Sequence, residues 1–100
     1  MSMIEQLDKI YENLKVLRNK TNDQNEFKKI RSQMDQINEQ RQKILDAAID
    51  NATEEYTSAT TEIKKAQTEI ESALDDLSKV ASAISKVSKM ISQVEKVLIG

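Results

Sequence analysis

The chain has 100 residues, of which 32% are charged and 38% are hydrophobic, and its formal net charge is −2. Histidine, cysteine and proline are absent and glycine occurs once, which excludes a disulfide framework, a zinc–thiolate site and a glycine-rich phosphate loop. Turn residues and aromatic residues are too scarce for a β-sheet, so the composition predicts a single all-α domain over residues 1–100.

The N-terminal half contains two amphipathic stretches with a polar stretch between them. Apolar residues recur at helical spacing over residues 3–17 and again over residues 27–48. Residues 18–26 read RNKTNDQNE and contain no hydrophobic side chain. Asp23 followed by Glu26 fits a capping box, and a π-bulge within a continuous helix is the alternative. We predict an arm that is kinked or broken near 18–26 but roughly collinear.

A turn is predicted near residues 49–53, although this stretch contains neither glycine nor proline. The apolar residues around it follow one another in consecutive steps of four, which breaks the heptad phase. Asn51 and Thr53 are residue types that favour turns and helix caps, and Glu54 follows Asn51 at the spacing of a capping box. We therefore expect the chain to reverse here. The alternative is one continuous helix from about residue 24 to residue 99.

The C-terminal half carries one unbroken heptad seam. From Ala52 to Leu98 the apolar residues alternate at steps of four and three, which is typical of a coiled coil. Folding the chain at residue 50 places this seam against residues 27–48, in layers such as Ile37 against Ile63, and Arg41 against an alanine. The sequence thus predicts a long antiparallel helical hairpin, a two-helix coiled coil with arms of about 68 Å at 1.5 Å per residue.

The apolar residues that flank the seam are more numerous than a two-helix coiled coil needs. A lone hairpin would leave them partly exposed to water. We expect a further helix to cover them, either from a second copy that completes a four-helix bundle or from another protein. These candidate interface residues are Ile4, Tyr11, Leu74, Ala81, Ala83, Met90 and Val97.

No catalytic residue, cofactor site or metal site is predicted. Histidine, the commonest general base and transition-metal ligand, is absent. Adjacent carboxylates such as Asp75 and Asp76 point in different directions on a helix, so we expect them to be surface charges. Nucleic-acid binding is not expected either, because acidic residues dominate positions 50–77 and the lysines of residues 79–96 lack interleaved aromatic residues.

These observations predict a non-enzymatic protein that acts through helix–helix association, as a homodimer or with a helical partner. An alternative is a small helical adaptor, inhibitor or secretion-type chaperone or substrate that captures a helix of another protein. The predicted shape resembles the helical hairpins exported by type VII secretion systems. Their turn carries Trp-x-Gly, whereas this chain has Ile49-Asp50-Asn51, so no family is assigned.

A third alternative is a peripheral membrane-surface protein that uses residues 79–100, an amphipathic segment with lysines on its polar side. Membrane contact is not the favoured reading, because the apolar side of this segment is expected to pack against residues 3–17. The N-terminus has no signal-peptide pattern and no apolar run is long enough to span a membrane. We expect a soluble cytoplasmic protein, with leaderless export as the alternative.

Overall fold

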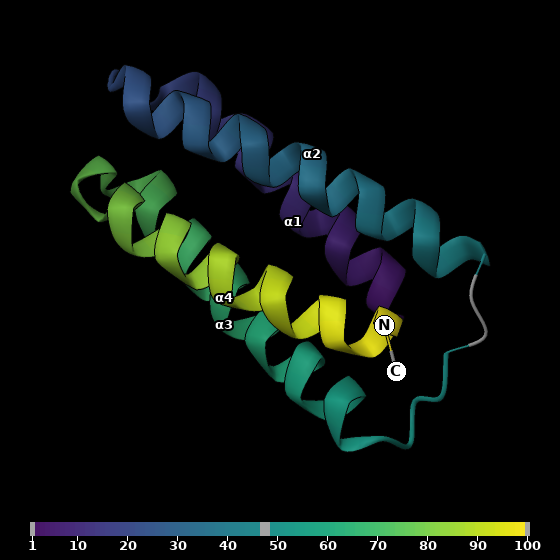
Figure 1. The fold of residues 1–100 in the computed structure, drawn as a ribbon. Coiled ribbons are helices and arrows are strands. Elements are labelled where there is room, and N and C mark those ends of the chain that lie inside the picture. Colours follow the sequence, from purple (N-terminus) through teal and green to yellow (C-terminus); the bar gives the residue numbers. More distant parts are fainter. Residues whose placement is uncertain (1, 47–48, 100) are drawn as a thin grey trace.

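The computed structural model describes residues 2–46 and 49–99, and in these ranges the protein consists of four α-helices packed against each other (Figure 1). They are α1 (Met3–Lys20), α2 (Gln24–Asp46), α3 (Glu54–Asp75) and α4 (Val80–Ile99), with a 3-10 turn, η1 (Leu77–Lys79), before α4. These ranges contain no strand. The prediction of an all-α protein is confirmed.

The four helices are arranged as two antiparallel hairpins. Helix α1 packs against α2, and α3 packs against α4. The hairpins join where α1 lies along α3 and α2 lies along α4, so that α1 is diagonal to α4 and α2 is diagonal to α3 (Figure 1). Residues 49–53, which we call the linker, lie before α3 at the same end of the molecule as the start of α1 and the end of α4. We call this the linker end.

Each helix buries one apolar face in a core shared by both hairpins. Removing these side chains from water supplies the main stabilising free energy, roughly 1.5–3 kcal/mol for each large aliphatic residue. Helix α3 contributes Ala59, Ala66 and Ala73 to this core, small side chains that allow close packing of a neighbouring helix. The largest fully buried hydrophobic side chains include Leu7, Ile10, Leu14, Leu17, Ile30, Ile37, Ile63, Ile70, Val80, Val87 and Met90.

The N-terminal arm is broken where predicted, but the prediction that it stays collinear is wrong. Helix α1 ends at Lys20 and α2 begins at Gln24, and the two helices pack against each other. The main-chain N–H of Glu26 donates to the Asp23 carboxylate at 3.0 Å, as a capping interaction requires. Reversal lets both helices bury their apolar faces in one core, so the molecule measures 40 × 20 × 19 Å. The predicted arms of about 68 Å do not form.

Helical structure is also interrupted where the central turn was predicted. Residues 49–53 are not helical, and residues 47–48 lie outside the described ranges. The cap of α3 is Thr53, whose hydroxyl accepts a hydrogen bond from the N–H of Tyr56 at 3.2 Å, and not Asn51 as predicted. The chain continues from α2 into the helix diagonal to it, α3, so the predicted layered pairing of residues 27–48 with residues 52–73 is wrong.

The sequence did not predict the reversal between α3 and α4. Asp76 has an extended backbone (φ −145°, ψ 101°), and its carboxylate accepts hydrogen bonds from the N–H and the hydroxyl of Ser78 at 3.1 and 2.7 Å. These hydrogen bonds hold the pKa of Asp76 below its usual value. The predicted unbroken helix is wrong at this point, and Leu77, predicted in the seam, is 40% exposed.

Candidate protein interface

Buried glutamines connect α2 to α4. The side-chain amide of Gln40, which is fully buried, donates to the main-chain carbonyl of Ile91 and to the carboxylate of Glu95, both at 2.9 Å. The same arrangement recurs one heptad earlier on both helices. Since both pairs require the same alignment, they fix the parallel register of α2 against α4. The earlier donor is Gln33, and its acceptors are the carbonyl of Ile84 at 2.8 Å and the hydroxyl of Ser88 at 2.9 Å.

The acidic helix α3 and the lysine-bearing helix α4 neutralise part of each other's charge. Glu62 of α3 is 8% exposed, and its carboxylate lies 3.8 Å from the ammonium of Lys89 and 3.6 Å from that of Lys65. The hydroxyl of Ser82 donates to Glu69 at 3.1 Å across the same pair of helices. The segregation of charge along the sequence therefore serves internal pairing in part.

Arg41 connects α1 to α2. Its guanidinium forms an ion pair with Asp8 and lies over the ring of Tyr11, 4.9 Å from the ring centroid. The prediction that Arg41 lies against an alanine of the C-terminal half is wrong, because α1 and not α3 covers this side of α2. Tyr11, one of the predicted interface residues, is half-buried in this contact.

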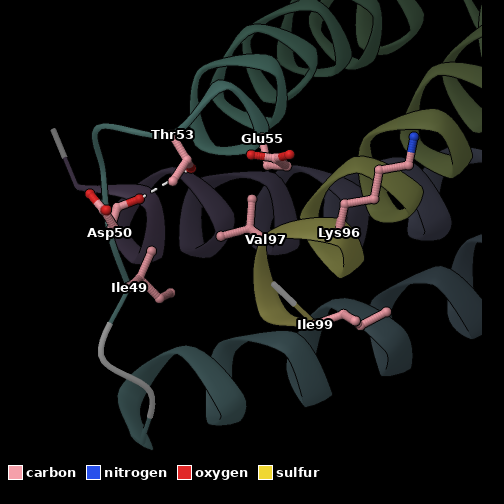
Figure 2. A pocket seen from close by; sticks show the side chains of 7 residues that line it. All are labelled: Ile49, Asp50, Thr53, Glu55, Lys96, Val97 and Ile99. Carbon is pink, nitrogen blue, oxygen red and sulfur yellow. Dashed lines mark hydrogen bonds between the residues drawn. The ribbon is translucent and has the colours of Figure 1, made fainter.

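A hollow of about 510 Å³ opens at the linker end, between the linker and the last turns of α4 (Figure 2). Figure 2 shows Ile49, Asp50 and Thr53 of the linker on one side, and the α4 residues on the other, with Glu55 of α3 between them. Three of the lining side chains are aliphatic and three are charged, so the hollow combines an apolar lining with an ionic rim. The residues that line it are Ile49, Asp50, Thr53, Glu55, Lys96, Val97 and Ile99.

A smaller hollow of about 190 Å³ shares Ile49 with the first one and faces the start of α1. Besides Ile49, its apolar lining comes from Met3, Ile4, Ile44 and Tyr56. Ile4 and Val97, two of the predicted interface residues, thus line neighbouring hollows at the linker end. Ile99 is 83% exposed there, an unusual environment for a side chain of this size.

The other five predicted interface residues do not lie at these hollows. Ala83 and Met90 are fully buried in the core, so the prediction that they face a partner is wrong for this structure. Both residues lie on α4, which packs against α3 and, in the other hairpin, against α2, so the chain itself covers positions that were expected to need a second copy. Leu74, like Tyr11, is partly buried and packs against the core, whereas Ala81 is exposed on α4.

In the described ranges, no three acidic side chains gather closely enough to hold a metal ion. None of the helices found there combines the length and the apolar character needed to cross a membrane. Ile49 and Ile99 were not predicted as interface residues, because neither belongs to a heptad position that flanks the seam. Comparisons of this chain with protein-family models, with curated proteins and with solved structures found no match.

Proposed function

We propose that this protein is a non-enzymatic interaction module of the four-helix-bundle type that associates with a second copy of itself through the linker end. The observation that carries the proposal is the hollow between the linker and α4, where Ile49, Val97 and Ile99 present aliphatic side chains at the surface (Figure 2). Grouped apolar side chains within a charged rim are typical of protein interfaces.

Burial of these side chains supplies the driving force for association. Ile99 is 83% exposed, and covering one such isoleucine stabilises a complex by roughly 1.5–3 kcal/mol. Ile4 and Ile44 extend the apolar surface into the neighbouring hollow. A helix end from another molecule that fills both hollows would bury all of these side chains together.

The charges of the rim favour a second copy as the partner. Asp50 stands on the linker, Glu55 on the first turn of α3 and Lys96 on α4 (Figure 2). A two-fold interface uses the same surface of both subunits. If residue i of one subunit contacts residue j of the other, then residue j of the first also contacts residue i of the second. Glu55 then pairs with the partner subunit's Lys96, and Lys96 pairs with the partner subunit's Glu55. A surface that carries both signs is therefore complementary to itself.

A helix of a different protein is the second candidate for the same surface, since the apolar lining accepts any amphipathic helix end. Binding to a membrane surface through residues 79–100 has less support. The apolar face of α4, including Val87, Met90 and Val94, is buried in the protein's own core and is not free to enter a lipid bilayer.

Sedimentation equilibrium of the purified chain tests the proposal. We expect the unmodified chain to form a concentration-dependent dimer. The Ile99→Asp dimer should be at least tenfold weaker, because the dimer would then bury a charge where it buries an aliphatic side chain in the unmodified chain. Val16→Asp is the matched control, since Val16 is 45% exposed on α1 near the opposite end. A chain that remains monomeric up to high micromolar concentration would contradict the second copy as partner.

A further inference from the structure

The reversal between α3 and α4 differs from the other two interruptions of helix. Residues 21–23 and 49–53 lie where the sequence loses its hydrophobic repeat. The apolar repeat continues through the third interruption at unchanged steps of four and three, by way of Ala73, Leu77 and Val80. The sequence of α3 and α4 is therefore that of one long helix with a continuous apolar seam.

This interruption consists of one extended residue, Asp76, and the 3-10 turn η1 that follows it. Asp76 is the only residue between α3, which ends at Asp75, and η1, which begins at Leu77. No residue in the described ranges has a positive φ, and the reversal contains no glycine or proline, so nothing in the backbone forbids a helical conformation at Asp76. The hydrogen bonds from Ser78 to the Asp76 carboxylate, at 2.7 and 3.1 Å, hold the reversal in place.

The reversal leaves the apolar side chain of Leu77 partly exposed to water. Its seam neighbours Ala73 and Val80 are fully buried, whereas Leu77 is 40% exposed at the tip of the hairpin. A continuous helix would return Leu77 to the apolar face that it shares with these neighbours. That face could be covered only by another molecule, because the chain's own α4 would then extend away from α3.

We infer that two copies of this chain exchange their α4 helices when Asp76 becomes helical. Each chain then has one helix from Glu54 to Ile99, about 69 Å long at 1.5 Å per residue. The two long helices run antiparallel, so that α3 of one chain packs against α4 of the other. This proposal concerns the end of the molecule opposite the linker end and does not depend on the proposed function.

The exchanged dimer re-forms the contacts of the closed chain between two molecules. Helix α4 of each chain takes the place of the other's α4 against α2 and α3, with the same glutamine and Glu62 contacts. Exchange of an identical element between subunits keeps the interactions of the monomer. It adds only the contacts at the hinge, which here is the straightened segment around Asp76 and Leu77. The added contact is between Leu77 and the partner subunit's Leu77, at the two-fold axis.

Two substitutions at adjacent positions shift the equilibrium between the closed monomer and the exchanged dimer in opposite directions. Asp76→Ala removes the cap and introduces the residue with the highest helix propensity, so we expect a dimer about tenfold tighter. Leu77→Pro is compatible with the closed chain, since proline is favoured in the first helical position and the residue before it prefers extended backbone, as Asp76 has. Within a continuous helix, however, proline at position 77 is strongly unfavourable.

The distance between α3 and α4 of one chain distinguishes exchange from any other dimer. The chain lacks cysteine, so spin labels can be placed at two exposed sites, Thr61→Cys on α3 and Ser92→Cys on α4. In the closed chain both sites lie on antiparallel helices whose axes are about 10 Å apart. In the exchanged dimer the intervening helix between positions 61 and 92 is about 46 Å long.

The experiment uses doubly labelled Asp76→Ala chains, refolded at high concentration with an excess of unlabelled Asp76→Ala chains, so that only distances within one chain are measured. We expect a dimer with the long distance, and a return to monomer with the short distance when Leu77→Pro is added. An Asp76→Ala chain that stays monomeric, or that dimerises with the short distance only, would overturn the proposal. The second result would leave association through the linker end intact.

Discussion

The side-chain amide of Gln40 on α2 donates a hydrogen bond to the main-chain carbonyl of Ile91 on α4, at a distance of 2.9 Å. Both residues are buried and they lie on different hairpins. A buried amide without a partner is costly, so this hydrogen bond ties the relative position of the hairpins to the stability of the fold. Gln33 repeats the contact one heptad earlier, which leaves only one alignment that satisfies both glutamines.

Gln40→Ala should lower the free energy of unfolding by roughly 2–3 kcal/mol, because it removes two hydrogen bonds and leaves a space in the core. Urea unfolding followed by circular dichroism measures this change. Gln42→Ala is the matched control on the same helix, since Gln42 is exposed, and we expect a change within about 0.5 kcal/mol. Equal effects for the two variants would refute the structural role of Gln40.

The Asp8–Arg41 ion pair should contribute modestly, because both side chains remain partly exposed. A double-mutant cycle with Asp8→Asn and Arg41→Gln is expected to give a coupling free energy of about 0.5–1 kcal/mol, smaller at high salt. Tyr11→Leu should lower stability by a similar amount through loss of the guanidinium contact. A coupling free energy of zero at low salt would show that the Asp8–Arg41 ion pair does not stabilise the contact between α1 and α2.

The cap of α3 can be tested with Thr53→Ala, for which we expect a loss of about 1 kcal/mol in the free energy of unfolding. The reason is that the N–H of Tyr56 loses its hydrogen-bond acceptor. Ser58→Ala, an exposed change within the same helix, should instead be neutral or slightly stabilising. If both substitutions stabilise the protein, Thr53 does not cap the helix.

Acidification should weaken the reversal at Asp76. The hydrogen bonds from Ser78 lower the pKa of Asp76 in the folded protein relative to the unfolded chain. The resulting stabilisation is fully present above the ordinary aspartate pKa and is lost as the pH falls through the lowered value. We expect Asp76→Asn to be less stable than the unmodified chain at neutral pH and equal to it in acid. A stability difference that does not depend on pH would contradict this assignment.

Local sequence signals predicted two of the three interruptions of helix. Residues 18–26 lack hydrophobic side chains and residues 49–53 disturb the heptad phase, so both interruptions leave a mark in the pattern. The reversal at Asp76 leaves none, because Leu77 keeps the apolar phase and no glycine or proline is present. The one available signal was the pair Asp76 and Ser78, which forms a local cap that competes with the helix.

The identity of neighbouring helices could not be read from periodicity. Any two heptad seams match in some alignment, so the pattern cannot tell whether α2 packs against α3 or α4. The side chains that decide this, Gln33 and Gln40, are polar residues in an otherwise polar stretch, and only their burial distinguishes them. Ala83 and Met90 were expected to contact a second molecule, but in the folded chain both are buried on α4, which packs against α2 and α3.

The most direct test of self-association through the linker end is to mix two charge-reversed chains. Alone, Glu55→Lys places lysine against the partner subunit's Lys96, and Lys96→Glu places glutamate against the partner subunit's Glu55, so each variant should be monomeric. Mixed in equal amounts, they should form a one-to-one dimer, because both contacts are again of opposite sign. Sedimentation equilibrium of the mixture gives the answer. A mixture that remains monomeric while the unmodified chain dimerises would contradict the proposed interface.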